Sequence, residues 1–220
     1  MTIKNNIELV KEGFANGVVP GGPLSEQERQ QMIQNAAYAF GNFLDALGCH
    51  WEEDPNSDNT PMRVAKAYVN DLWAGRYEGA PDITAFPSDG YDGMVFEGGI
   101  PLTSMCSHHH QTILGKVHVA YIPGEDSKVI GLSKLNRLVE HFSRRGAIQE
   151  QLTVAIHNAI HTIINDNCGV AVMIEATHNC VQCRGVKHGG ASMKTSKLTK
   201  AFKNDPATRN EFYEFIRGYN

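Results

Sequence analysis

The sequence predicts an α+β fold, a sheet with helices on one face that follows a helical N-terminal region. Residues 25–75 hold two stretches with the apolar spacing of amphipathic helices. From residue 94 onward, short alternating segments typical of strands enclose two more helical stretches. An antiparallel four-stranded sheet with a helix pair on one face is the simplest arrangement of these parts. We expect an N-terminal arm and helical region over residues 1–92 and the α+β domain over residues 93–220.

The two N-terminal helices have recognisable boundaries. Ser25 with Glu28 forms a capping-box pattern that predicts a helix start, and Gly48 marks the end of this helix. Thr60–Pro61 has the residue types preferred at the N-cap and first helical position, so it predicts a second helix. That helix is expected to stop at Gly75.

The second part of the chain alternates strand and helix signals. Four segments have strand character: 94–100, 115–123, 128–132 and 169–177. Between the third and fourth, Ser133 is a plausible N-cap of a helix closed by Gly146. A second helix follows, with Glu150 in its first turn.

Composition excludes several classes of protein. The chain has 220 residues, 41% of them hydrophobic, and a formal net charge of -4, so it has no general basic excess for nucleic acid or membranes. No apolar stretch is long enough for a membrane span, and the N-terminus lacks an apolar secretory segment. Five cysteines, two of them close to histidines, favour reduced thiols and a metal in the cytoplasm over a disulfide framework.

Thiols and imidazoles gather at two places about seventy residues apart. Cys106 and His109 lie in one cluster, and Cys180 closes the other. Thiolate and imidazole are preferred zinc ligands, and three protein ligands leave the open position of a catalytic zinc. His108 and His178 would then lie beside the metal, in place for proton transfer.

Two other interpretations stay open at this point. Cys180 and Cys183 form a CxxC, which with Cys106 and His109 could make a closed Cys3His site that only stabilises the fold. The chain could also bind no metal. The remaining histidines have no such context, and we interpret them as ordinary structural or surface residues: His110, His118, His141, His157 and His161.

Basic residues are grouped locally, which suits a small anionic ligand. Lys134 and Arg137 share one face near a helix start, although a solvated helix face is the default for such a pair. Arg184 is a stronger candidate because it follows the CxxC directly. Glu150 is either a first-turn carboxylate or the acceptor for a purine or pterin edge.

Motifs along most of the chain resemble those of the GTP cyclohydrolase I family. The resemblance rests on the following stretches: 60–65, 104–109, 115–123, 129–137, 149–150, 178–186 and 192–196. It implies the tunnelling fold, in which subunits join their sheets into a barrel, and a homodecamer with sites at subunit interfaces. It also implies hydrolysis of GTP at C8 of guanine, release of formate and rearrangement to 7,8-dihydroneopterin triphosphate, the first step of a pterin, folate or deazapurine pathway.

The family's functional residues have counterparts in this chain. By resemblance, Zn²⁺ is held by Cys106, His109 and Cys180, and the acid/base groups are His108 and His178.

The substrate contacts also follow from the resemblance. Glu150 with Gln149 would receive the guanine edge, and Ser133 would lie near the ribose. Four basic residues would meet the triphosphate: Arg63, Lys134, Arg137 and Arg184.

This chain departs from the family pattern in the metal loop. Ser107 stands where the family usually has glutamate, and residues 110–113 replace a usual Leu-Leu-Pro-Phe. Rate, substrate preference or regulation could differ as a result. The alternatives are a relative that stops at the ring-opened formamide or prefers another purine nucleotide, and a metal-stabilised nucleotide-binding oligomer without full activity.

Overall fold

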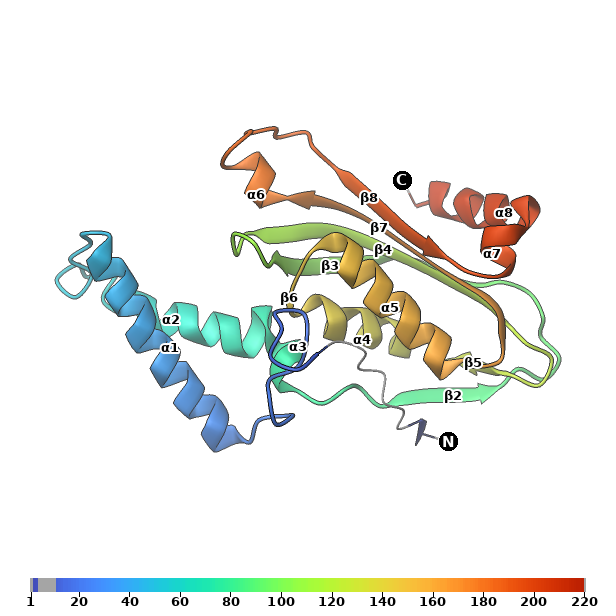
Figure 1. Ribbon diagram of the computed structural model, residues 1–220, viewed down its shortest axis with the longest axis horizontal. Coiled ribbons are helices and arrows are strands. Elements are labelled where there is room, and N and C mark those ends of the chain that lie inside the picture. Colours follow the sequence, from blue (N-terminus) through green and yellow to red (C-terminus); the bar gives the residue numbers. More distant parts are fainter. Residues whose placement is uncertain (1, 4–10, 220) are drawn as a thin grey trace.

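A five-stranded sheet forms the centre of the computed structural model, which describes residues 2–3 and 11–219 (Figure 1). Its strand order is β6-β3-β4-β7-β8. Neighbouring strands are antiparallel, except that β6 runs parallel to β3. The strands are β3 (Val95–Cys106), β4 (Thr112–Pro123), β6 (Gly146–Ala147), β7 (Asn167–His178) and β8 (Met193–Leu198).

The five-stranded sheet contains four antiparallel strands, β3, β4, β7 and β8, but β8 was not among the four strands predicted from the sequence. The predicted strand over 128–132 is β5 (Lys128–Ile130), which leaves the main sheet and pairs with β2 (Ile83–Pro87). With β1 (Thr2–Ile3), these strands form a separate three-stranded sheet. The fourth antiparallel strand of the main sheet is β8, which the sequence pattern did not predict because most of its residues are polar. Its position comes from pairing with β7, in which Thr195 is opposite Ile174.

Two helices cover one face of the sheet, as predicted. They are α4 (Leu132–Ser143) and α5 (Gln149–Ile163), and their apolar stripes pack on the inward residues of β3, β4 and β7. Helix α4 begins two residues earlier than predicted: Gly131 is the N-cap, and Ser133 lies inside the first turn. Gly146 does not close α4 but lies in β6, so it contributes to the sheet.

The opposite face of the sheet is partly covered by the C-terminal helices α7 (Ala201–Asn204) and α8 (Pro206–Arg217) (Figure 1). Asp205 caps α8 by accepting hydrogen bonds from two backbone N–H groups. Phe202 and Phe212 are fully buried against Ala120 and Ala171 of the sheet. The central strands are therefore apolar on both faces.

The N-terminal helices extend to one side of the sheet (Figure 1). They are α1 (Glu26–Ala46), α2 (Thr60–Ala67), the π-helical turn η1 (Tyr68–Leu72) and α3 (Ala74–Tyr77). The capping box of Ser25 and Glu28 is present as predicted. Helix α2 instead takes Asn59 as its N-cap, with Thr60 as its first helical residue.

Gly75 does not end the second helix, as the sequence suggested, but lies buried inside α3. A Cβ atom there would collide with the backbone carbonyl of His141 on α4. The glycine is thus required by close packing between α3 and α4. Within the described part of the chain, no helix is long and apolar enough to cross a membrane.

Candidate metal centre and active site

Three potential metal ligands meet at one end of the five-stranded sheet, which we call the metal end. Cys106 ends β3, His109 lies in the turn before β4, and Cys180 lies in the short helix α6 (Asn179–Gln182) that follows β7. Strands β3 and β7 flank β4 and are both antiparallel to it, so the carboxyl ends of β3 and β7 lie at the same end of the sheet. The ligand atoms of these three residues all lie within 4.8 Å of one another.

Backbone hydrogen bonds hold the turn that carries His109. The N–H of Cys106 donates to the Gln111 carbonyl at 2.9 Å, and the N–H of His110 donates to the Cys106 carbonyl at 3.0 Å. His110 has a positive φ of 50°, which tightens this turn. Its ring lies 5.2 Å from that of Trp73, between centroids, so the metal loop also packs on the N-terminal helical region.

The chemistry of the donor set fits zinc. Two sulfurs and one imidazole nitrogen are preferred zinc ligands, and bond lengths of about 2.0–2.3 Å place tetrahedral ligand atoms roughly 3.5–3.8 Å apart. The three side chains therefore need to close by at most about 1 Å around an ion. Burial, followed by the hydrogen bond and charge of Cys106, raises the pKa of Cys180. A bound cation reverses this effect because it favours the thiolate.

Cys183 lies outside this ligand group. Its Sγ lies 2.7 Å from the Asn179 carbonyl oxygen and 3.7 Å from Oε1 of Gln111. Among the described residues, the potential metal-binding group contains only three ligands. The geometry thus favours an open three-ligand site over a closed Cys3His site.

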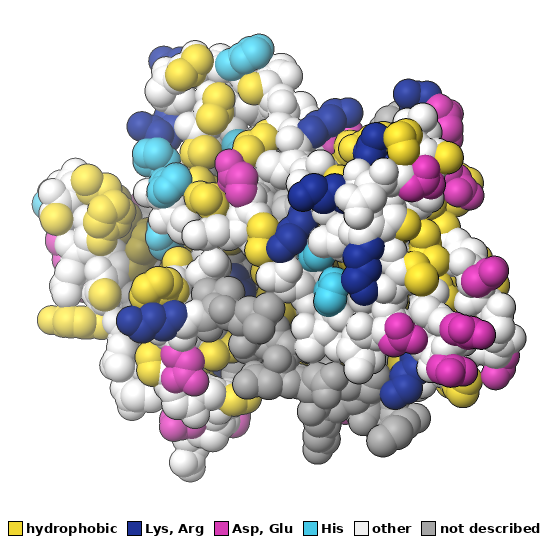
Figure 2. Space-filling model, turned by 45° about the vertical axis from the view of Figure 1, so that its right-hand side comes forward, with side chains coloured by type: hydrophobic (Ala, Val, Ile, Leu, Met, Phe, Trp, Pro, Cys, Tyr) yellow, Lys and Arg dark blue, Asp and Glu magenta, His cyan; other side chains and the backbone are white. Residues whose placement is uncertain are grey.

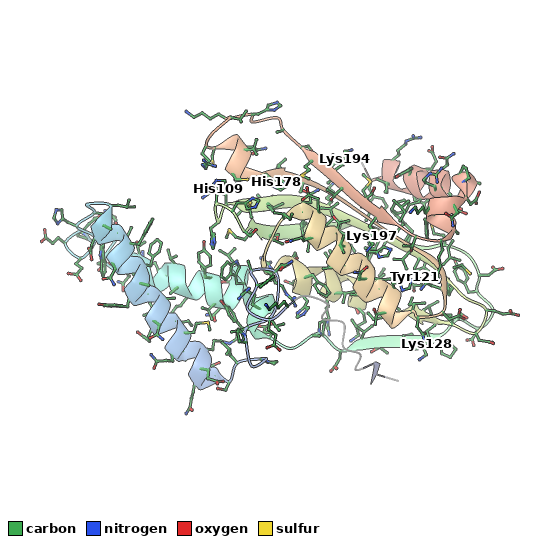
Figure 3. All side chains as sticks on the ribbon, viewed as in Figure 1. His109, Tyr121, Lys128, His178, Lys194 and Lys197 are labelled. Atoms are coloured by element: carbon green, nitrogen blue, oxygen red, sulfur yellow. The ribbon has the colours of Figure 1, made fainter. Side chains whose placement is uncertain are left out.

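The two histidines expected to transfer protons lie beside these ligands. His178 ends β7 and is two residues from Cys180, and Figure 3 shows it at the same end of the sheet as His109. His108 is exposed, and its ring centroid lies 6.3 Å from that of His109. Burial lowers the pKa of His178, and the charge of Glu150 opposes this shift.

Gln149 and Glu150 begin α5 at the metal end, but their side chains differ in exposure. Glu150 is exposed. Gln149 is only 1% exposed, and its Oε1 lies 2.8 Å from Nε2 of His178. Its amide nitrogen faces β7 and β8, where the Thr195 hydroxyl is one of its partners. Thr195 lies in the 192–196 stretch of the resemblance but was assigned no role by sequence, because nothing in a polar edge strand marks one threonine as part of a buried network.

The basic candidates do not all reach the metal end. Arg184 follows α6 and is exposed, and its charge weakly opposes the burial that raises the pKa of Cys180, which places it near the ligands. Arg63 is exposed on α2. Figure 2 shows dark blue basic side chains grouped near the centre of one face and most acidic side chains toward its right-hand rim.

Ser133, Lys134 and Arg137 lie away from the metal ligands of their own chain. They occupy the first half of α4, whose last residue is followed closely by β6, the strand that pairs with Met105 and Cys106. At 1.5 Å per helical residue, Ser133 is about 15 Å along the axis from the end of α4. We call this region the far end of the sheet, and Figure 3 shows nearby Lys128 opposite His109 and His178.

Comparisons with known proteins show which family the chain belongs to. The profile of the GTP cyclohydrolase I family matches residues 36–217. The chain is 45% identical over 211 residues to GTP cyclohydrolase 1 of Aliivibrio salmonicida, covering 95% of this chain and 94% of the relative. It is 40% identical over 206 residues to the protein of that name from Shewanella amazonensis, covering 93% and 92%.

A solved structure, the archaeosine synthase QueF-Like in the apo form, is 17% identical with a TM-score of 0.39, covering 48% of this chain and 92% of that one. A likeness of this extent does not establish a shared fold. The family profile and the relatives do establish the family, because the profile covers residues 36–217 and the relatives cover more than nine-tenths of the chain. The chain belongs to the GTP cyclohydrolase I family.

Proposed function

We propose that this protein converts GTP to 7,8-dihydroneopterin triphosphate with release of formate, the reaction of its family. The observation that carries the proposal is the convergence of Cys106, His109 and Cys180 within 4.8 Å, with His178 at the end of the adjoining strand. Cys106, His109 and Cys180 would hold a zinc ion, which when bound would lower the pKa of a water molecule for attack on guanine C8.

The chain's own residues bind the substrate and move protons. Ring opening requires a proton on the leaving purine nitrogen, which His178 supplies, while His108 serves a second proton transfer. The exposed Glu150 carboxylate accepts hydrogen bonds from the N–H groups of the guanine edge. Arg184 binds the triphosphate, because a guanidinium matches phosphate oxygens in charge and geometry.

The active site is completed by a second copy of the chain in a tunnelling-fold assembly, for which we propose a homodecamer. Ser133, Lys134 and Arg137 are held at the far end, away from the ligands of their own chain. A neighbouring subunit can present them to the metal end when sheets join edge to edge, with Ser133 near the ribose and the two basic residues, together with Arg63, on the triphosphate. All five cysteines are free thiols, which fits a reducing cytoplasm and a pterin or folate pathway.

The test is incubation of the purified protein with GTP, following GTP loss, formate and pterin fluorescence together. We expect formate and the fluorescent pterin in equal amounts. GTP loss without either product indicates a relative that stops at the ring-opened formamide. Unchanged GTP at full zinc content indicates a non-catalytic nucleotide-binding oligomer. Cys180→Ala is the matched control for metal-dependent turnover.

A further inference from the structure

Gln149 is buried in a closed hydrogen-bond network that connects helix α5 to strands β7 and β8. Its amide nitrogen Nε2 lies 3.1 Å from the Ile174 carbonyl oxygen, 3.0 Å from the Met193 carbonyl oxygen and 3.1 Å from the Thr195 hydroxyl. Its Oε1 lies 2.8 Å from Nε2 of His178. Both ends of the amide are therefore occupied within the chain, and the side chain is 1% exposed.

The partners of the amide fix its orientation. Backbone carbonyls only accept hydrogen bonds, so the group that faces Ile174 and Met193 has to be the NH₂ of Gln149. The amide oxygen then faces His178, and an amide oxygen only accepts. His178 consequently donates from Nε2, which leaves Nδ1 as the ring nitrogen not bound to the glutamine.

Two threonines complete the network. Thr153 donates its hydroxyl proton to the Gln149 backbone carbonyl at 2.8 Å, one turn earlier in α5. Thr195 Oγ1 lies 2.7 Å from Thr153 Oγ1, so Thr195 donates to Thr153, and its oxygen shares the two N–H protons of the Gln149 amide with the two backbone carbonyls. This chain of bonds pins the glutamine against β8, on the side opposite His178.

We propose that Gln149 is a positioning residue that holds the proton of neutral His178 on Nε2, so that Nδ1 takes up a proton from solvent and passes it to the leaving purine nitrogen, rather than a side chain that contacts guanine. The proposal deepens the proposed function and rests on it for the identity of the reaction. Contact with guanine would require Gln149 to break bonds to two buried carbonyls, which are costly to leave unpaired. A neighbouring group that fixes the tautomer and orientation of a reactive histidine is a common requirement of proton transfer.

The first test separates positioning from substrate binding. Gln149→Met keeps the length of the side chain but removes both hydrogen-bonding ends. We expect kcat for GTP to fall by about 10–100-fold, as for other residues that orient reactive groups, with KM within about threefold and zinc content unchanged. A variant with unchanged kcat and a raised KM would overturn the proposal, because it would place Gln149 on the substrate.

A milder series guards against misfolding of the first variant. Thr195→Val removes the hydroxyl that faces Gln149, and Thr195→Ser restores it. We expect kcat to fall about three- to tenfold in the valine variant and to recover in the serine variant. Thr162→Val is the matched control, because the Thr162 hydroxyl bonds only to the Asn158 carbonyl in its own helix, at 2.9 Å. Equal kcat in the valine variant and the control would contradict the proposal.

A third readout does not depend on turnover. With ¹⁵N-labelled histidine, the His178 signals, assigned by comparison with a His178→Asn variant, should show the proton on Nε2 in the unmodified protein. In Gln149→Met the two neutral forms should mix. A proton on Nδ1 in the unmodified protein would reject the tautomer even if GTP is turned over. If the tautomer is as stated but GTP is not turned over, the proposed function fails and the positioning geometry stands.

Discussion

The two ends of the five-stranded sheet differ in how complete they are within one chain. At the metal end, Cys106, His109, His178 and Cys180 come together from two stretches of the chain, and Gln149 supports His178 from a third. At the far end, α4 presents basic and hydroxyl side chains with no metal ligand of the same chain nearby. Under the proposed function, the reacting groups are therefore assembled inside one subunit, whereas part of the substrate binding depends on contact between subunits.

This difference has a physical cause in the strands. A long antiparallel ladder fixes the ends of neighbouring strands relative to one another, and β4 pairs with β7 from Ile113–His178 to Pro123–Asn167. Precise placement of ligands is therefore easy at a strand end. Residues on the first turns of α4 are also fixed in place, because α4 packs on the sheet, but this packing holds them away from the metal end.

The largest expected effect comes from removing one potential zinc ligand, which alters the metal end and leaves the far end unchanged. Cys180→Ala should lose zinc and reduce GTP turnover by more than about 100-fold, the upper range for residues that only surround a metal. Cys183→Ala is the matched control and should keep about one zinc per chain with most of the activity. Zinc analysis and steady-state rates measure both. Loss of zinc from Cys183→Ala would instead restore the closed structural site.

The second prediction tests whether the two ends of different copies form one site. His178→Ala and Arg137→Ala should each be nearly inactive as homo-oligomers. Co-expressed in equal amounts, they should recover about a quarter of the wild-type rate, because random assembly gives that fraction of interface sites both intact residues. If both residues of a site came from the same chain, no mixture would contain an intact site. Recovery close to zero with mixed oligomers present therefore contradicts the shared site.

The third prediction concerns Ser107, the departure from the family inside the metal loop. Its backbone N–H donates to the carbonyl of Ala147 at 3.3 Å, and Ala147 lies in β6, the strand that leads into α5. Glutamate there would add a strong acceptor near the metal end, so Ser107→Glu should raise kcat/KM for GTP by up to about 10-fold. Steady-state kinetics of both proteins provide the measurement. Unchanged or lower kcat/KM would mean that other residues of the loop, such as His110 and Gln111, compensate for the missing glutamate.

The smallest expected effect concerns His157, which lies on α5 between the two ends of the sheet, and it changes the stability of the fold rather than the rate of the reaction. Burial is the main cause that lowers the pKa of His157 on α5 to about 4. The unfolded chain, with an ordinary histidine pKa near 6.5, binds a proton more readily below pH ~6.5. Stability contributed by neutral His157 is therefore present above that pH and is lost as pH falls toward 4, on the order of 2 kcal/mol.

His157→Gln should flatten this pH dependence, since glutamine stays neutral. Thermal unfolding of both proteins at pH 7 and pH 5 measures it, and the wild type should lose more Tm on acidification. Activity per folded chain at pH 7 should not change. An equal loss of Tm in both proteins would show that other groups cause the acid sensitivity.

Local sequence patterns predicted much of the secondary structure and the metal ligands. The capping box at Ser25 was found correctly because it depends on residues three apart. The helix pair followed from apolar periodicity, and the ligand types followed from thiols and imidazoles. The predicted N-caps Thr60 and Ser133 were misplaced by one and two residues, because several adjacent residues suit a helix end.

Tertiary structure decided what no local pattern encodes. Strand β8 is polar and became part of the sheet through its pairing with β7, and β5 left the sheet because β2 pairs with it. Gly75 is needed by the backbone of α4, far along the chain, and not by the end of its own helix. Gln149 was recognisable as a site residue by sequence, but its buried bonds to β7, β8 and His178 exist only once the strands have paired. The sequence by itself determined which chemical groups are available, because residue type sets ligand and donor chemistry. Only the folded chain decided which groups face one another, because long-range pairing and close packing set distances that local spacing does not contain.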